Sequence, residues 1–207
     1  MKRFPIFSTL IVGAAVATMI ALGLWQLDRR AEKAALLALY RANLTQPAMA
    51  FPKTAPVADA ALFRRSALMC LEVTGWKTEA GRSIQGASGY RWIAACRTGA
   101  EGPGALVDMG VARNPSVRPT WSGGPISGRI STEPSHMSLF DRLGGKHEVL
   151  RPMLIATMPA AGLAASAPPS PEDVPNNHLA YAVQWFLFAS IAAIIYLIAL
   201  RRRMRAG

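Results

Sequence analysis

Three histidines, His136, His147 and His178, are the side chains in this sequence with the most capacity for chemistry. Catalytic triads, zinc sites and covalent haem attachment each need a histidine within a defined local pattern. The sequence contains no nucleophile elbow, His-Glu-x-x-His, Cys-x-x-Cys or glycine-rich nucleotide-binding pattern. Met137 next to His136 supplies a soft thioether suited to Cu(I), but two adjacent residues do not make a site, and a surface loop is the simpler interpretation. We therefore expect no enzyme active site.

His178 differs from the other two histidines in its surroundings. It follows Pro175-Asn176-Asn177, where either asparagine can cap a helix, so it lies in the first turn of an apolar helix. Tyr181 and Trp185 follow at i+3 and i+7, which places two aromatic rings on the same helix face. Two interpretations remain open. His178 could be an interfacial residue of a membrane helix, or the axial ligand of a haem whose propionates are attracted to the helix N-terminus.

Two stretches without charged residues are long enough to cross a membrane, residues 6–24 and 179–200. At about 1.5 Å of rise per residue, a helix of either length covers the ~30 Å hydrocarbon core. We expect transmembrane helices over residues 6–25 and 176–200. A cleaved signal peptide is the alternative for the first stretch, but this run is long for a signal and continues without a break into a helical pattern. Trp25, at the end of the first span, suits the aromatic belt and joins the candidate cofactor-binding residues.

Positive charge predicts the orientation of the two spans. The net charge is +11, and four arginines lie in the tail 201–207 behind the second span. The positive-inside rule places this tail in the cytoplasm. Arg29 and Arg30 locally favour the reverse orientation for the first span, but two spans force both termini to the same side. We expect cytoplasmic termini and a periplasmic region over about residues 27–178. The other basic residues are scattered and accompany no nucleic-acid motif, so we expect membrane lipid as their partner and no nucleic acid.

The region between the spans is predicted to contain one β-rich domain. A helical extension is expected over residues 26–46, the β-rich domain over 47–158, and a mobile Pro/Ala linker over 159–175. Short stretches with strand-like alternation, bounded by Gly or Pro, occur at residues 69–74, 82–85, 90–97, 105–112, 125–131 and 149–157. This pattern favours a small antiparallel sandwich or barrel. The expected fold class is α+β, with two transmembrane helices flanking one extracytoplasmic domain, and residues 1–5 and 201–207 as short cytoplasmic ends.

Two cysteines, Cys70 and Cys96, would face an oxidising compartment, where disulfides can form. If a strand over residues 82–85 lies between their strands, the two residues are roughly 9.5 Å apart, two strand spacings. A disulfide needs Cα atoms within about 7 Å. Two outcomes therefore remain open: a disulfide, if curvature of the sheet brings the cysteines together, or two small buried hydrophobic residues.

Two segments at opposite ends of the chain resemble one protein family. Leu22–Gln26, followed by Arg29 and Lys33, is similar to the first-span signature of the surfeit locus protein 1 family of cytochrome c oxidase assembly factors. Residues 176–186, Asn-Asn-His-Leu-Ala-Tyr-Ala-Val-Gln-Trp-Phe, resemble the signature with which that family enters its second span. Shorter matches lie between them, at residues 73–75, 89–90 and 106–108.

The resemblance implies a bacterial inner-membrane protein that assists maturation of the catalytic subunit of haem a-containing oxidases. Haem a binding by members of the family, through a histidine at the membrane edge, transfers to His178 as an axial ligand of haem iron. Tyr181, Trp185 and Trp25 are then candidate contacts to the haem. We expect a non-enzymatic chaperone that binds or shields haem a transiently and promotes its insertion into oxidase subunit I, with haem A synthase as a further candidate partner. The alternative is a cofactor-free membrane scaffold that stabilises oxidase assembly intermediates.

Overall fold

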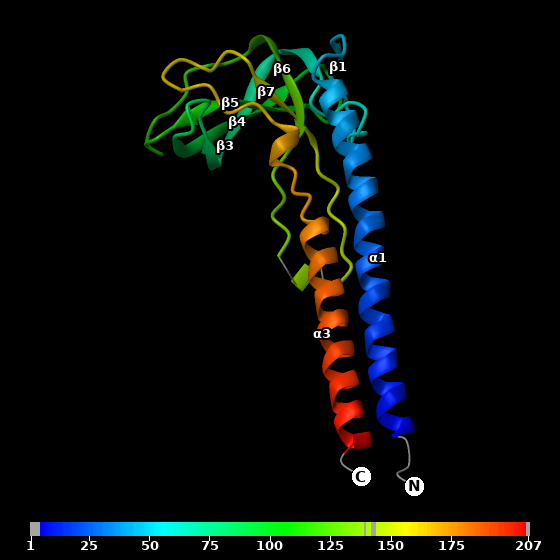
Figure 1. Ribbon diagram of the computed structural model, residues 1–207. Helices are drawn as coiled ribbons and strands as arrows, with labels where there is room; N and C mark the ends of the chain where they lie inside the picture. Colours follow the sequence, from blue (N-terminus) through cyan, green and yellow to red (C-terminus); the bar gives the residue numbers. More distant parts are fainter. Residues whose placement is uncertain (1–4, 139, 142–143, 206–207) are drawn as a thin grey trace. The chain divides into compact units, whose positions relative to one another are not determined.

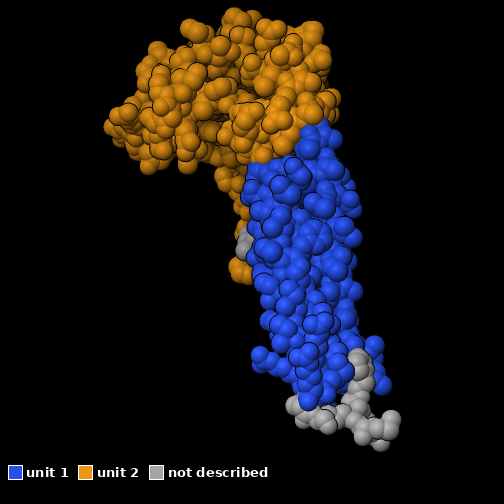
Figure 2. Space-filling view, viewed as in Figure 1, with its two compact units in different colours: residues 1–36, 175–207 blue, residues 37–174 orange. Residues whose placement is uncertain are grey.

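The computed structural model, which describes residues 5–138, 140–141 and 144–205, divides the chain into two units (Figure 2). We call residues 1–36 and 175–207 the helical unit, and residues 37–174 the sheet unit. The α+β class predicted from the sequence is confirmed, because two long apolar helices at the ends of the chain flank a seven-stranded sheet domain.

Among the described residues, the helical unit consists of two helices, α1, Ile6–Asn43, whose last residues from 37 on belong to the sheet unit, and α3, His178–Arg205 (Figure 1). Both are long and apolar enough to cross a membrane. Neither helix has a proline in its interior, so the backbone hydrogen bonds run without a break. α1 ends three residues before the expected position 46, since Thr45 N–H bonds to the carbonyl of Ala42 in a closing turn and Pro47 follows.

The two helices pair antiparallel, because the start of α1 contacts the C-terminal half of α3 and a residue midway along α1 contacts the first residue of α3. Thr9 Oγ1 lies 2.5 Å from Tyr196 Oη, and Gln26 Oε1 lies 2.7 Å from His178 Nδ1. Partly or fully buried positions recur at three and four residues along both helices, which is the spacing of a continuous packing seam. These positions include Thr9, Val12, Val16, Met19, Gly23 and Gln26 on α1, and His178, Ala182, Trp185, Ala189 and Tyr196 on α3.

The sheet unit contains one seven-stranded mixed sheet (Figure 1). Its strands are β1 Met49–Ala50, β2 Arg65–Cys70, β3 Glu72–Arg82, β4 Ser88–Arg97, β5 Ala105–Ala112, β6 Gly124–Thr132 and β7 Pro152–Ala156. The order is β1-β2-β6-β7-β5-β4-β3, with parallel pairing of β1 to β2 and of β5 to β7. A short 3-10 helix, η1 Pro171–Asp173, precedes α3. The neighbouring central strands β5 and β7 are buried along their whole length, as expected for strands covered on both faces.

The sheet differs from the small antiparallel sandwich or barrel expected from the sequence. It is a single open sheet of mixed direction, because β7 lies between β5 and β6 and runs antiparallel to β6 and parallel to β5. Alternation within a strand cannot indicate which distant segment will pair with it. The stretch expected as one strand over residues 69–74 is divided between β2 and β3, and residues 83–87 form the turn between β3 and β4. The remaining expected strands overlap β4, β5, β6 and β7, with ends that differ by at most three residues.

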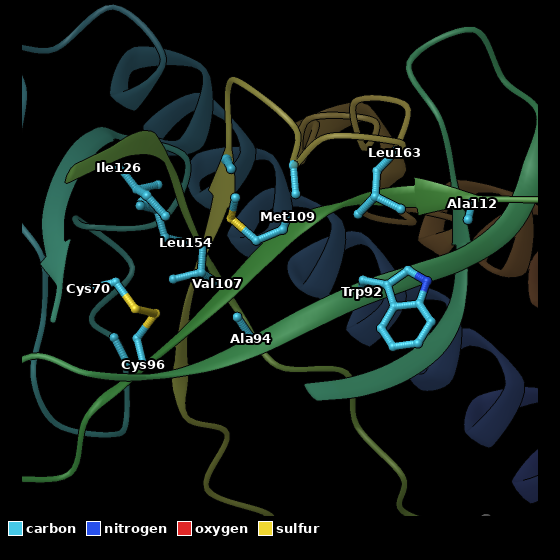
Figure 3. Close-up of a cluster of buried hydrophobic side chains, with 13 residues drawn as sticks. Cys70, Trp92, Ala94, Cys96, Val107, Met109, Ala112, Ile126, Leu154 and Leu163 are labelled. Carbon is cyan, nitrogen blue, oxygen red and sulfur yellow. A yellow bond between two sulfur atoms is a disulfide. The ribbon is translucent and has the colours of Figure 1, made fainter. Parts of the chain in front are cut away.

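A disulfide joins Cys70 at the end of β2 to Cys96 in β4, with Cα atoms 5.2 Å apart (Figure 3). The strand expected over residues 82–85 does not lie between the two cysteines, because residues 83–87 form the turn between β3 and β4. Residues 72–82 instead form β3, which pairs directly with β4 and places Val73 opposite Cys96. Since Leu71 alone separates β2 from β3, Cys70 lies next to the same end of β4. β2 and β4 are far apart in the strand order, so the sheet must curve strongly to bring them together.

The main hydrophobic cluster lies against this disulfide. Both cysteines are nearly fully buried, and Val107 of β5, Leu154 of β7 and Ala94 of β4 pack in the same cluster (Figure 3). Side chains from several strands of the curved sheet therefore fill its interior, and the disulfide closes one side of it.

Residues 160–167, which the sequence predicts to be part of a mobile linker, are paired with the sheet. The backbones of Ala164 and Val111 of β5 exchange two hydrogen bonds, of 2.8 and 2.9 Å. Ala167 N–H bonds to the carbonyl of Arg82 at the end of β3, and Ala160 is buried in the main cluster. The absence of a side chain at Gly110 of β5 allows this close approach, because a Cβ atom there would lie 2.6 Å from the carbonyl oxygen of Ala164.

Candidate functional site

His178 is the first residue of α3. The N–H of Tyr181 bonds to the carbonyl of Asn177 at 3.3 Å, which makes Asn177 the N-cap of the helix. The N–H groups of residues 178–180 therefore have no partner within the helix, and together they form a small positive region suited to an anionic group. Of the two asparagines considered from the sequence, it is Asn177 that occupies the capping position.

The side chain of His178 is held by Gln26 of α1. Nδ1 of the imidazole lies 2.7 Å from the Gln26 side-chain oxygen Oε1, and both residues are partly buried. An amide oxygen only accepts, so in this arrangement Nδ1 carries the proton and donates it. Nε2 has no hydrogen-bond partner among the described residues, and in a neutral ring it keeps a free lone pair.

Small residues beside this hydrogen bond let the two helices approach closely. Ala182, one turn after His178, is 1% exposed, and Gly23, about one turn before Gln26, is also buried. A Cβ atom at Gly23 would lie 2.6 Å from Cε1 of the Phe186 ring, so a larger residue there forces the ring or the helices to move. The seam thus brings α1 and α3 together at the level where Gln26 must reach the imidazole.

The three predicted aromatic residues are placed differently around the histidine. Trp185 is partly buried and packs edge-to-face with Phe188 at 6.2 Å between ring centroids. Tyr181 and Trp25 are each 52% exposed, so each leaves ring surface available to a ligand. Trp25 points about 100° away from its neighbour Gln26 around α1. The structure therefore brings His178 together with Gln26, and none of the described contacts joins it to Trp25.

Gln26 is the residue of this site that the sequence analysis missed as a functional group. In the sequence it stands out only as the last residue of a family signature. The sequence did contain a sign that Gln26 faces the other helix. Gln26 continues the three- and four-residue spacing of Thr9, Val16, Met19 and Gly23, and so it lies on the face of α1 that packs against α3. Its partner on the other helix could not be derived without the register of the pair.

The donor set around His178 suits a haem better than a bare metal ion. Among the described residues, no group of three His, Cys, Asp or Glu side chains could hold a metal ion. A haem needs only one or two protein ligands, because its ring supplies the others. His178 offers a free Nε2 lone pair, and exposed aromatic surface lies on the same helix at Tyr181. His136, the other histidine considered as a ligand, is instead an exposed partner of Glu79 at 3.1 Å.

A second polar group, which the sequence analysis did not single out, is buried in the sheet unit. Asp108 is 0% exposed in the middle of apolar β5. Its Oδ1 accepts hydrogen bonds from Ser166 Oγ at 2.7 Å and from Gly110 N–H at 3.0 Å, and Oδ2 lies 3.7 Å from Arg91 Nη1. Burial raises the pKa of the Asp108 carboxyl above its usual value, against the lowering effects of these neighbours. The group ties residues 160–167 to β5, which is a structural role.

A cavity of about 610 Å³ lies on the sheet unit, lined by Arg65, Ser127, Ile155 and Ser166 among others. None of the predicted site residues lines it. The candidate site is therefore the group of side chains around His178, and it does not depend on this cavity.

Comparison with known families identifies one match. The model of the SURF1 family matches residues 13–190, most of the chain. The matched range contains His178, Gln26, Tyr181, Trp185 and Trp25. No curated protein matches the sequence significantly.

Proposed function

Because this chain belongs to the SURF1 family, we propose that it is an assembly factor that binds or shields haem a and promotes its insertion into subunit I of cytochrome c oxidase. The family is associated with assembly of cytochrome c oxidase and is not a known enzyme class. The observation that supports haem binding is the state of His178, with Nδ1 bonded to Gln26 and Nε2 without a partner among the described residues.

The proposed role of the protein is reversible ligation and shielding. His178 Nε2 would bind the haem iron, and the hydrogen bond to Gln26 of the other helix holds the imidazole in place. The exposed ring of Tyr181, with Trp185 on the same helix, supplies flat apolar surface for the macrocycle. The unpaired N–H groups at the start of α3 attract a propionate. Apart from the reversible bond to the iron, these groups make or break no bond of the haem, so the proposed activity is that of a chaperone rather than of an enzyme.

We propose that the sheet unit lies in the periplasm and that both termini lie in the cytoplasm. Two helices capable of crossing a membrane flank the sheet unit, as in a two-pass membrane protein. The arginines behind the second span support this orientation. The disulfide supports it independently, because such bonds persist in the oxidising periplasm and are rare in the cytoplasm. Alkaline phosphatase fused after Gly99 should be active, and the same enzyme fused after Gly207 should be inactive. An active C-terminal fusion would reverse the orientation.

The proposed partners follow from the proposed role. Oxidase subunit I receives the haem, haem A synthase is a candidate source of it, and membrane lipid surrounds the two spans. Deletion of the gene should lower the activity and haem a content of the oxidase and leave quinol oxidases without haem a unchanged. An oxidase with its full haem a content in the deletion strain, in cells without a second copy, contradicts the assembly role.

Haem binding is tested on the full-length protein purified from cells that make haem a. We expect the wild-type protein to carry haem, His178→Ala to lose most of it, and His178→Met to keep part of it with a shifted spectrum, since a thioether can still bind iron. His147→Ala, which removes an exposed histidine of the sheet unit, is the matched control and should keep wild-type haem.

Two outcomes would contradict haem ligation by His178. If His178→Ala retains haem in wild-type yield with an unchanged spectrum, the ligand is another residue. If the wild-type protein carries no haem while the deletion strain still lacks mature oxidase, the protein is the cofactor-free scaffold.

A further inference from the structure

We propose that Gln26 is a positioning residue for His178: its side-chain oxygen fixes the imidazole in the tautomer whose Nε2 is free to bind iron. The structural part of this inference, the tautomer, stands on the hydrogen bond between the two residues. Only the identity of the group that Nε2 binds rests on the proposed function.

A neutral imidazole carries one proton, on either Nδ1 or Nε2, and only the unprotonated nitrogen can bind a metal. The nitrogen that carries the proton is set by the hydrogen bond that the ring makes. Gln26 Oε1, 2.7 Å from Nδ1, has no proton to give, so it stabilises the Nδ1–H form and leaves Nε2 with its lone pair. Without this acceptor, nothing in the described residues holds the proton on Nδ1.

The hydrogen bond also fixes the direction of the ring. A histidine on a single helix can turn about two side-chain bonds, and a second attachment point removes most of this freedom. Gln26 supplies that attachment from the opposite helix. Metal-binding histidines usually donate their second N–H to such a partner, and loss of the partner typically lowers metal affinity about 10- to 100-fold.

The packing seam maintains the register that this bond needs. Gly23 and Ala182 keep the two helices close next to the bond, and the contact between Thr9 and Tyr196 lies at the other end of the pair. A slide of one helix by a single residue would move Gln26 by about 1.5 Å along α3 and break the 2.7 Å contact.

A different role is available to the same contact, because polar side chains between membrane helices can serve only to hold the helices together. Such a role needs a hydrogen bond but does not need a particular tautomer. The two roles are separated by the position of the imidazole proton and by the effect of variants that keep or remove an acceptor at position 26.

The first experiment measures the tautomer without haem. The full-length protein, labelled with ¹⁵N-histidine and purified haem-free in detergent, gives distinct nitrogen signals for the three histidines, assigned through His136→Ala and His147→Ala. We expect His178 to show a protonated Nδ1 and an unprotonated Nε2. Gln26→Leu should lose this preference, and Gln26→Glu, which keeps an acceptor oxygen, should retain it. A proton on Nε2 in the wild-type protein, or an unchanged tautomer in Gln26→Leu, overturns the proposal.

The second experiment measures binding of added haem by the same haem-free proteins. We expect Gln26→Leu to bind haem about 10- to 100-fold more weakly than the wild-type protein. Gln26→Glu should restore binding with a shifted absorption spectrum, because a carboxylate makes the imidazole a stronger donor to iron. Gln184→Leu is the matched control: Gln184 lies exposed on α3, and its replacement should leave binding unchanged.

The two experiments distinguish failure of this inference from failure of haem binding. If the tautomer depends on Gln26 but no variant binds haem, positioning stands and the proposed ligand is wrong. If haem binds through His178 with equal affinity in Gln26→Leu, haem binding stands and Gln26 only holds the helices together.

Discussion

Removal of the disulfide between Cys70 and Cys96 should destabilise the sheet unit strongly. The bond closes a loop with a sequence separation of 26 residues, and the loss of loop-closure entropy in the unfolded chain predicts a contribution of about 3.5 kcal/mol at 25 °C. Replacement of both cysteines by alanine is the suitable change. Both side chains are buried in the hydrophobic cluster, where alanine is compatible and serine would bury an unpaired hydroxyl.

Urea unfolding of the full-length protein in detergent, followed by tryptophan fluorescence, measures this contribution. Trp76, Trp92 and Trp121 of the sheet unit form edge-to-face pairs that unfolding would separate. With an m value of about 2 kcal/mol per M, the midpoint should fall by about 1.8 M urea in the double variant. Wild-type protein treated with a reductant is the control and should unfold at nearly the same urea concentration as the variant. A loss below about 1 kcal/mol would refute the reasoning, since closure of the loop would then constrain the unfolded chain little.

Three further substitutions test packing and buried polar groups. Gly23→Ala should destabilise the helix pair in detergent by about 1–3 kcal/mol in a thermal unfolding assay, because the added Cβ meets the Phe186 ring. Gly13→Ala is the control and should not change the stability, because no atom lies within 4 Å of a Cβ there. Equal effects of the two variants would contradict the close approach of the helices at Gly23. Tyr40→Phe removes a 2.6 Å hydrogen bond to Asp59 and should lower the free energy of unfolding in urea by about 1.5–3 kcal/mol. An unchanged free energy of unfolding would show that this bond does not contribute to stability. Folding raises the pKa of the Asp108 carboxyl, so the folded protein binds this proton more tightly than the unfolded chain does. Asp108 therefore destabilises the folded wild-type protein progressively as the pH rises above the pKa of the unfolded chain, about 4. The stability of Asp108→Asn relative to wild type should therefore increase as pH rises from about 4; a constant difference would contradict the raised pKa.

The two long apolar helices and the position of His178 at the start of α3 could be predicted from the sequence because their signals are local. A charge-free run long enough to cross a membrane is visible without knowledge of any contact, and so is the position of His178 beside the capping Asn177. The contact of His178 with Gln26 could not be predicted in the same way. It depends on the relative register of two helices separated by the whole sheet unit, which a pattern within one helix does not determine.

The sheet illustrates the same limit. Alternation placed β4, β5 and β6 almost correctly, since each strand carries its own pattern. Insertion of β7 between β5 and β6 depends on pairing across the chain, and the wrong strand order led to the wrong distance between Cys70 and Cys96. Alanine and proline are common in linkers, which is why the sequence predicts a linker over residues 159–175; within it, the segment 160–167 instead pairs with β5 and with the end of β3 through backbone hydrogen bonds.

The strand order has a consequence for self-association. A sheet edge with unpaired N–H and C=O groups can recruit the same edge of another molecule and start aggregation. One edge of this sheet is the two-residue β1, too short to support such pairing, and the other is the eleven-residue β3. β3 carries the exposed Lys77, a charge that opposes pairing with another edge. At the last residue of β3 and just beyond it, Ala167 N–H bonds to the carbonyl of Arg82 and Ile84 N–H bonds to the carbonyl of Ala165. The 160–167 segment thus covers one end of the more vulnerable edge, which would otherwise be open to pairing with another molecule.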